Sequence, residues 1–403
     1  MRLWRACPIV SHDNRSPASQ FTGLPMTLSP VDLALEFPQA PNLLYFNHAA
    51  VAPWPRRAAE AVTRFAVENV RNGAIDYRRW LEVERSLRER LARLINAASA
   101  DQIALLKNTS EGLSAVAFGL AWRPGDNIVG IARDFPSNRV VWEALDRIGV
   151  ELRPVDVNSA PDPEAALIAA CDGRTRLLAV SWVHYVTGLR LDLERLGSHC
   201  RSRDILFCVD AIQGLGALRL DVQACGADFV AADGHKWLLG PEGVALFYVS
   251  TIGMDRLTPC QLGWHSLARS GDYDRTDREL APSARRFEPG SPNLLGIHAL
   301  EASVALLETV GPDVVETRVL EHTARLRSLL PRARPEITLQ GPDSPNRWSG
   351  IVSFRPAGRS ADDWVAYLGG QGVFCAARSG CVRVSPHFYN TENEIARFLR
   401  LLS

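Results

Sequence analysis

The stretch that decides the fold is residues 209–250, VDAIQGLGALRLDVQACGADFVAADGHKWLLGPEGVALFYVS. Asp210 ends an apolar run that begins at Ile205, and a run of this kind is typical of a buried parallel strand. Lys236 lies between a second apolar run, residues 229–232, and a glycine-rich turn. Open α/β sheets bind ligands outside the carboxyl ends of their strands. The sequence therefore predicts that Asp210 and Lys236 meet in one crevice.

Lysine is rare in this chain, and its rarity adds weight to Lys236. The sequence has 45 Lys plus Arg, yet Lys107 and Lys236 are its only lysines. Arginine is thus the ordinary surface cation. A guanidinium stays charged and does not readily form a Schiff base, whereas an amine does. The alternative reading of Lys236 is a solvated surface charge, but its flanking motif disfavours that reading, and we take Lys236 as the candidate catalytic residue.

Composition places the chain among ordinary globular proteins. At 403 residues, with 46% hydrophobic and 22% charged residues, it is long enough for a large domain and a smaller one. The net charge is zero and no basic cluster stands out, which argues against nucleic acid as a partner. No apolar run has the length of a membrane span. The eight cysteines form no C-x-x-C pair, so we expect no disulfide framework, no metal site and a cytoplasmic location.

Strand-like and helix-like segments alternate from residue 43 to residue 250, which predicts an α/β fold with a mostly parallel sheet. The pattern loosens afterwards into a smaller α+β arrangement. We expect a disordered leader at residues 1–30, with a translation start at Met26, a large cofactor-binding domain at 31–290 and a small C-terminal domain at 291–403. Ser29 is a candidate N-cap of the first helix.

A second chemical feature is the junction Asn108-Thr109-Ser110-Glu111-Gly112, which lies between a short strand and an apolar helix. Backbone N–H groups and hydroxyls at a helix N-terminus can bind a phosphate dianion. Thr109 and Ser110 also fit a plain role as helix caps. Together with an amine suited to a Schiff base, however, they favour pyridoxal 5'-phosphate (PLP), which needs both an amine and a phosphate site.

Four motifs occur in a fixed order: Asp210-x-x-Gln213, Gly234-His235-Lys236, Arg286-Phe287-Glu288-x-Gly290-Ser291 and Arg383-x-Ser385-x-x-x-x-Tyr389-Asn390-Thr391. In this order the chain resembles the class V aminotransferase-fold enzymes over residues 43–403. These include cysteine desulfurases, selenocysteine lyases and isopenicillin-N-epimerase-like proteins. The resemblance implies PLP as cofactor, fold type I with a mostly parallel seven-stranded sheet, and a homodimer.

The resemblance also implies a role for each matching residue. Lys236 would bind PLP covalently and move protons, and Asp210 would pair with the pyridinium nitrogen. Arg383 would bind the substrate α-carboxylate in a bidentate fork. The remaining cofactor contacts would come from a set of side chains that includes one from the partner subunit: Gln213 to the phenolic oxygen, and Thr109, Ser110, His235 and the partner's Ser291 to the phosphate.

The chain departs from the desulfurase pattern at three positions around the ring. Phe135 replaces a ring-stacking histidine, and it can stack but cannot exchange protons. Tyr185 replaces an asparagine expected near the phenolic oxygen. Asp233 replaces a serine that donates to the phosphate, so its carboxylate must point elsewhere or the phosphate must be bound differently. Two histidines, His48 and His184, lie near the expected cleft; we count His48 and Tyr185 with Arg383 as substrate-binding candidates.

The largest departure is near the C-terminus, where the related desulfurases carry a persulfide cysteine on an extended loop. Here only four residues separate Arg378 from Arg383. We expect Cys375 and Cys381 to be buried small side chains, because free cysteines commonly are.

These observations predict a PLP-dependent enzyme that acts on an amino acid or amine, either as an aminotransferase or as a Cβ–S or Cβ–Se lyase. A cysteine desulfurase with a persulfide cysteine is the first alternative. A non-catalytic PLP-binding regulator is the second, and it is disfavoured because no DNA-binding module accompanies the fold.

Overall fold

The computed structural model describes residues 29–274 and 276–402. The leader expected at residues 1–30, and the start at Met26, fall on residues 1–28 and so lie outside the described residues. The first helix, α1 (Pro30–Glu36), begins at the predicted N-cap. The Ser29 side chain accepts from the Asp32 backbone N–H, and the Asp32 side chain returns the interaction as a capping box.

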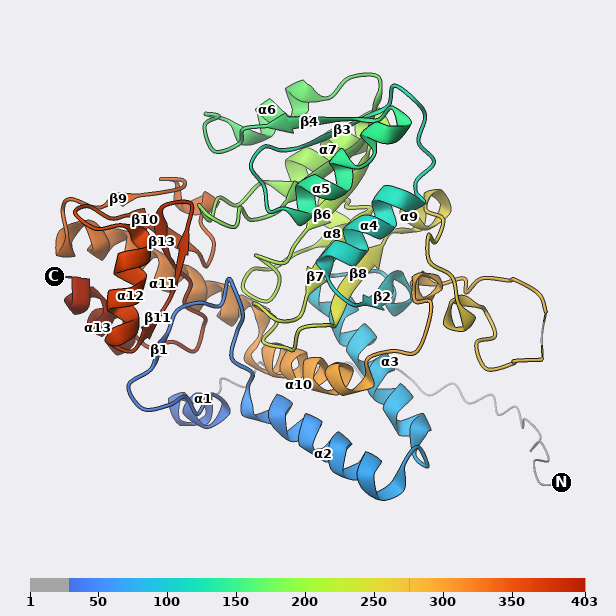
Figure 1. The fold of residues 1–403 in the computed structure, drawn as a ribbon, viewed down its shortest axis with the longest axis horizontal. Coiled ribbons are helices and arrows are strands. Elements are labelled where there is room, and N and C mark those ends of the chain that lie inside the picture. Colours follow the sequence, from blue (N-terminus) through green and yellow to red (C-terminus); the bar gives the residue numbers. More distant parts are fainter. Residues whose placement is uncertain (1–28, 275, 403) are drawn as a thin grey trace.

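A seven-stranded sheet forms the centre of the larger part of the molecule (Figure 1). All neighbouring strands are parallel except β8, which is antiparallel to both of its neighbours. The predicted mostly parallel sheet is confirmed. In spatial order the strands are β2 (Ile103–Leu106), β8 (Ala245–Val249), β7 (Phe229–Asp233), β6 (Leu206–Asp210), β5 (Thr175–Ser181), β3 (Asn127–Ile131) and β4 (Glu151–Val155).

Helices cover both faces of this sheet, so the alternating side chains of its central strands enter two separate cores. One core joins Val209 and Val230 to helices on one face, and the other joins Cys208 and Phe229 to helices on the opposite face. The first face is covered by α3 (Tyr77–Leu94), α6 (Pro163–Ala170), α7 (Leu193–Arg203), α8 (Val222–Cys225) and α10 (Leu294–Val310), and the second by α4 (Thr109–Gly119) and α5 (Ser137–Glu143).

The C-terminal residues form a smaller α/β unit with its own core, seen in red at the left of Figure 1. Its four-stranded antiparallel sheet has the order β12-β13-β10-β9. The chain's early segment β1 (Leu44–Tyr45) joins this unit by pairing with β11 (Val373–Phe374). The other elements are β9 (Thr338–Leu339), β10 (Val352–Arg355), β12 (Ala376–Arg378), β13 (Cys381–Val384), α11 (Pro312–Ala333), α12 (Ala361–Gly370) and α13 (Glu392–Leu402).

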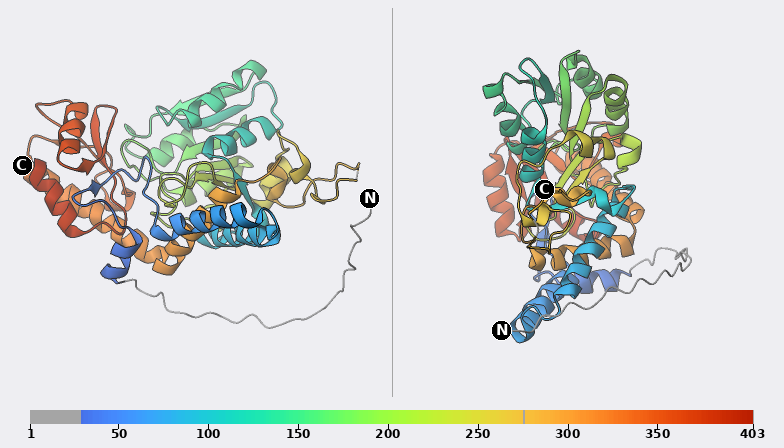
Figure 2. Two further views of the ribbon diagram at one scale, coloured as in Figure 1. Left: turned by 60° about the horizontal axis from the view of Figure 1, so that its bottom comes forward. Right: turned by 90° about the vertical axis from the view of Figure 1, so that its right-hand side faces the viewer.

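Helix α10 packs along α2 (Arg56–Asn72) and α3, below the large sheet in Figure 1. A turned view shows the same three helices side by side (Figure 2). The domain division near residue 290 stays a prediction. The structure adds that α10, just after that point, supplies Ile297 and Leu300 to the core of the large sheet. A short helix, α9 (Thr251–Arg256), follows β8.

Within residues 29–274 and 276–402, no single helix is long and apolar enough to cross a membrane. The bent pair of α10 and α11, at 83° to each other, has that length and composition only when the two helices are taken together.

Candidate active site

Lys236 and Asp210 lie at the carboxyl ends of two central strands of the large sheet, as the strand pattern predicts. Asp210 is the last residue of β6, and Lys236 lies in the turn that follows β7, the next strand of the sheet. Both are buried, with exposed fractions of 4% for Asp210 and 8% for Lys236. The carboxylate accepts a 3.0 Å hydrogen bond from the Ile212 backbone N–H and a 2.6 Å bond from the Asn138 side-chain amide. This places an anion and an amine in a common, largely dry site.

The charge state of the Lys236 amine is set by burial. Burial is the main cause that lowers its pKa; Asp210 and Asp233 oppose the change, Arg383 and Arg378 add to it, and the net pKa is about 8. Burial also raises the pKa of Asp210, with the two hydrogen bonds acting against it. An amine with a pKa near 8 is present partly as the free base near neutral pH, which is the form that attacks a carbonyl.

Phe135, Tyr185 and Arg383 lie together beside Lys236. The Lys236 Nζ is 5.5 Å from the centroid of the Phe135 ring, and the Tyr185 ring packs edge-on against Phe135 at 5.5 Å and 79°. Arg383, on β13, donates a 2.7 Å hydrogen bond to the Tyr185 carbonyl. The three residues therefore join the small unit to the strand ends of the large sheet.

Arg383 is a buried guanidinium with unused hydrogen-bonding capacity. Its exposed fraction is 1%, it has no acidic partner within the described residues, and its Nε has no hydrogen-bond acceptor there. Burial lowers its pKa to about 10, and Arg378 adds to that effect. A buried cation without a counter-ion costs free energy, and an anionic ligand with a planar carboxylate would relieve that cost.

Thr109 and Ser110, which are predicted to bind the phosphate, lie at the N-terminus of α4. Thr109 is its first residue, and the Asn108 side chain caps the helix by accepting from the Glu111 N–H. Thr109 Oγ1 accepts from the Asp233 N–H at 3.0 Å, which leaves its own hydroxyl hydrogen free. Ser110 is exposed, and its hydroxyl lies 2.7 Å from that of Ser137 at the start of α5. Hydroxyls and free N–H groups thus meet at this helix end, as predicted.

Asp233 points at His235 and not at a phosphate. Its Oδ2 is 3.2 Å from Nδ1 of His235, an ion-pair distance without an aligned hydrogen bond, and its Oδ1 has no partner within the described residues. The acid that departs from the desulfurase pattern therefore lies beside His235, a residue that is itself predicted to contact the phosphate.

Gln213 bridges two segments around the site. Its amide nitrogen donates to the Ala49 carbonyl at 3.0 Å, and its amide oxygen accepts from the Trp237 indole at 3.3 Å. One N–H of the amide remains for a cofactor oxygen. Trp237 directly follows Lys236, so Gln213 also fixes the turn that carries the lysine.

The structure corrects the expectation that His48 binds substrate. His48 has an exposed fraction of 0%, and both ring nitrogens are engaged, Nδ1 with the Ser385 carbonyl at 2.8 Å and Nε2 with the Tyr389 hydroxyl at 2.6 Å. Burial lowers its pKa well below the usual histidine value. It offers no free nitrogen to a ligand and instead links its own segment to Ser385 and Tyr389 of the small unit.

His184, by contrast, lines the large cavity beside the site and has a ring nitrogen without a partner within the described residues.

Ser291 is not brought to the other predicted residues within one chain. It is exposed and lines a cavity of about 430 Å³ with Leu106, Glu111 and Asn293. Its role in the partner's site stays a prediction.

Cys375 and Cys381 are buried, as predicted. Arg378 of β12 is paired with Cys381 of β13, and the two strands are joined by Ser379 and Gly380 alone. Both turn residues have positive φ angles, 50° and 74°, as a tight two-residue hairpin requires. Burial raises the pKa of Cys375 to about 12 and also raises that of Cys381. Neither thiol lies on an extended loop, and neither favours the thiolate form.

A cavity of about 1070 Å³ adjoins the site on the side of the small unit. Its wall includes side chains from both parts of the molecule: Asp134, His184, Tyr185, Arg355 and Cys381. An amino acid substrate needs far less space, so solvent and products can pass through this opening.

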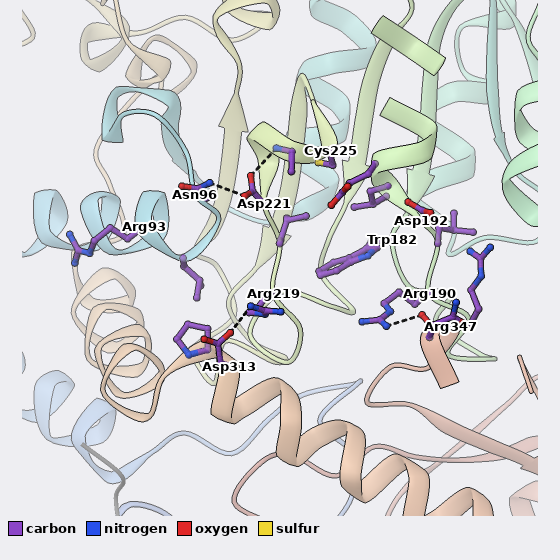
Figure 3. Close-up of a pocket in the computed structure, with 18 residues that line it drawn as sticks. Arg93, Asn96, Trp182, Arg190, Asp192, Arg219, Asp221, Cys225, Asp313 and Arg347 are labelled. Carbon is purple, nitrogen blue, oxygen red and sulfur yellow. Dashed lines mark hydrogen bonds and ion pairs between the residues drawn. The ribbon is translucent and has the colours of Figure 1, made fainter. Parts of the chain in front are cut away.

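A second hollow, of about 750 Å³, contains none of the predicted site residues and is drawn in Figure 3. Its arginines are already paired with acids: Arg190 with Glu316, Arg219 with Asp313 and Glu316, and Arg347 with Glu164. A hollow whose cations are neutralised in this way offers no strong site for an anion.

Three side chains near Asp210 were not found by sequence reasoning: Asp134, Asn138 and Ser181. Asn138 donates to both Ser181 and Asp210, and the Ser181 hydroxyl donates to Asp134. Asp134 and Asn138 flank the predicted Phe135 in Arg133-Asp134-Phe135-Pro136-Ser137-Asn138, and Ser181 is the last residue of β5. The closeness of Asp134 and Asn138 to Phe135 in the sequence was the one available signal.

PLP fits the residues that meet here. The site offers a partly neutral amine, a buried carboxylate, a helix N-terminus with free hydroxyls and an unpaired buried guanidinium. Within the described residues, buried polar atoms of Arg383, Asp233 and Asn138 lack partners, as a site shaped for a polar ligand would leave them.

Comparisons with known proteins agree with this arrangement. A family model described as aminotransferase class-V matches residues 44–398. A probable cysteine desulfurase of Methanothermobacter thermautotrophicus is 31% identical over 387 residues, which cover 90% of this chain and 95% of the relative. The isopenicillin N epimerase of Streptomyces clavuligerus is 32% identical over 374 residues, which cover 89% and 93%.

Solved structures show the same likeness. A mutant of the protein C-DES with glycine covalently linked to its PLP cofactor superimposes with a TM-score of 0.86 at 25% identity, covering 92% of this chain and 99% of that one. The cystine C–S lyase C-DES with its product cysteine persulfide gives 0.85 at 26% identity, covering 91% and 99%.

Proposed function

The chain belongs to the class V aminotransferase family, and we propose that this PLP-dependent enzyme is a Cβ–S lyase that works without a protein persulfide. The β12–β13 hairpin is the observation that carries the proposal. Persulfide formation needs a mobile, exposed thiolate, whereas Cys381 is buried in a strand three residues after Arg378. Carbon–sulfur cleavage is supported by the relatives named as cysteine desulfurases and by the cystine C–S lyase among the similar structures.

The cofactor would be held by Lys236, Asp210, Gln213, Thr109 and His235. When bound, PLP serves as an electron sink that eases bond breaking at the α- and β-carbons of an amino acid. Asp210 supplies a fixed negative charge at the sheet edge, stabilised by the bonds from Ile212 and Asn138.

The substrate would be oriented by Arg383. Its unused Nε and planar fork suit a bidentate bond to the α-carboxylate, which fixes the angle of the bonds at the α-carbon. Lys236 Nζ, with its depressed pKa, is suited to take the proton from the α-carbon. Phe135 cannot exchange protons, so the lysine would be the proton carrier on its side of the site.

Product analysis tests this proposal. The purified protein loaded with PLP would be incubated with L-cystine and with L-cysteine, and pyruvate, alanine, ammonia and sulfur products would be measured. Elimination gives pyruvate and ammonia together with hydrogen sulfide from L-cysteine or cysteine persulfide from L-cystine, whereas desulfuration leaves alanine and transfers sulfur to the protein. We expect pyruvate and ammonia in equal amounts. Alanine as the main product would support desulfuration, a 2-oxo acid formed only with an amino acceptor would support transamination, and loss of optical activity alone would support epimerisation.

Reconstitution of the apoprotein should depend on pH through the Lys236 amine. Because burial disfavours the charged form, the reactive free base increases as pH rises through about 8, the pKa of this lysine, and not through the ordinary value of 10.5. We expect the rate of PLP incorporation, followed by absorbance, to rise between about pH 7 and pH 9 and then to level off. A rate that keeps rising to pH 10 and above would show that the lysine is not depressed.

A homodimer is also part of the proposal. Ser291 is exposed and lines a cavity that includes none of Lys236, Asp210 and Arg383, so a second chain is a suitable recipient. Over a dilution series, sedimentation would measure the fraction of dimer and an assay would measure activity. We expect activity to fall as the dimer dissociates. Full activity of a monomer would contradict it. An amino acid substrate and a cytoplasmic location likewise remain proposals.

A further inference from the structure

Four buried polar side chains form a continuous hydrogen-bonded chain that ends at Asp210. The Ser181 hydroxyl lies 2.8 Å from both carboxylate oxygens of Asp134. The Asn138 amide nitrogen lies 3.1 Å from the Ser181 hydroxyl and 2.6 Å from Oδ2 of Asp210. All four are buried, and they follow or end the neighbouring strands β3, β5 and β6.

The direction of each hydrogen bond in this chain follows from the carboxylates at its two ends, with Asn138 donating both to Ser181 and to Asp210. An ionised carboxylate only accepts, so Asp134 takes the single hydroxyl hydrogen of Ser181. The Ser181 oxygen then has only lone pairs to offer to Asn138, which must present an N–H to it. The second N–H on the same nitrogen then faces Asp210. The amide oxygen is left without a partner within the described residues, so the orientation is imposed by the chain and not by that oxygen.

Asp134 is itself held in place by the backbone. Its Oδ1 accepts a 2.7 Å bond from the N–H of Phe135, the residue that packs beside Lys236. Burial raises the pKa of Asp134 to about 7, and the Asp210 carboxyl adds to the rise. The two carboxyls are thus close enough to affect each other, yet they share no direct hydrogen bond.

We propose that Asp134 is a positioning residue that acts through Ser181 to fix the Asn138 amide, and so holds Asp210 as an anion in one orientation toward the cofactor. This inference rests on the proposed cofactor site and not on the lyase reaction. Without the carboxylate, the Ser181 hydroxyl can turn toward Asn138. The amide can then reverse, and its oxygen would face Asp210 and repel it.

The test uses the full chain with Asp134→Asn, Ser181→Ala and the double variant. The dissociation constant of PLP from each apoprotein and the pH midpoint of the bound cofactor's absorbance change would be measured. Each single change removes a hydrogen bond that fixes the orientation of the Asn138 amide. We therefore expect PLP to bind about tenfold more weakly and the midpoint of the absorbance change to move by about one pH unit. Because both residues act along one chain, the double variant should be no weaker than the weaker single variant.

Asp156→Asn is the matched control, since it removes a carboxylate whose partner, Arg133, is next to Asp134 in sequence but outside the chain of bonds. It should leave both quantities unchanged, and melting of each apoprotein would establish folding. Ser181→Ala, a small change, keeps the test open if Asp134→Asn fails to fold. Wild-type affinity and midpoint in Ser181→Ala, or fully multiplicative effects in the double variant, would overturn the inference. Failure of the unaltered protein to bind PLP would overturn the cofactor assignment instead.

Discussion

Replacing Lys236 by alanine is expected to lower turnover by about ten-thousand-fold, because the change removes both the covalent attachment of PLP and the proton carrier. Borohydride reduction of the unaltered holoenzyme should fix the cofactor to the peptide that contains residue 236. The same treatment of Lys236→Ala should leave no reduced adduct. Peptide mass spectrometry and steady-state rates measure the two effects.

Lys107→Ala is the control for this prediction. Lys107 is the only other lysine of the chain and is exposed at the end of β2. Its removal should leave the adduct and the rate in place. A reduced adduct on Lys107 in the unaltered protein would show that the catalytic amine has been misassigned.

Replacing Asp210 by asparagine should lower turnover by about a thousandfold, since a preorganised charge in a dry site is worth this much in comparable sites. The substitution keeps the shape of the side chain, so the loss would come from the missing negative charge. It would be measured as the rate at saturating PLP, together with the absorbance spectrum of the bound cofactor.

Asp228→Asn is the matched control, because Asp228 is also a buried aspartate of this sheet. It lies at the opposite, amino end of the strands and accepts from the Phe207 N–H and the Ser250 hydroxyl. Its loss should reduce stability without changing turnover per folded molecule. Near-normal turnover in Asp210→Asn would show that Asp210 has only a structural role.

The fold and the centre of the site could be predicted because both depend on local patterns. Apolar runs that end in a polar residue marked the strands, and parallel strands bring their carboxyl ends to one edge. Asp210 and Lys236 were placed together on that basis, and the structure puts them at neighbouring strand ends. The scarcity of lysine gave a signal that does not depend on the fold.

The remaining features depend on side-chain directions that sequence does not give. The sequence left open whether Asp233 points away from the phosphate or the phosphate is bound differently, and the structure places its carboxylate beside His235, two residues later. His48 was expected in the cleft, but the small unit supplies the Ser385 carbonyl and the Tyr389 hydroxyl, which bury and engage it. These contacts join residues more than 300 positions apart in the sequence. The hydrogen bonds that link Asp134 to Asp210 likewise depend on how the carboxyl ends of β3, β5 and β6 align in the sheet.

Sulfur release by the double variant Cys375→Ala with Cys381→Ala is the most direct test of the proposal that no protein thiol takes part. Both thiols are buried, with pKa values raised by burial, and elimination requires neither of them. We predict that the double variant keeps most of its pyruvate and sulfur release from the true substrate. Arg383→Ala, assayed beside it, should lose about a hundredfold in rate because the carboxylate is no longer oriented. Abolished sulfur release in the double variant, with PLP still bound and Arg383 intact, would contradict the account and establish a persulfide mechanism.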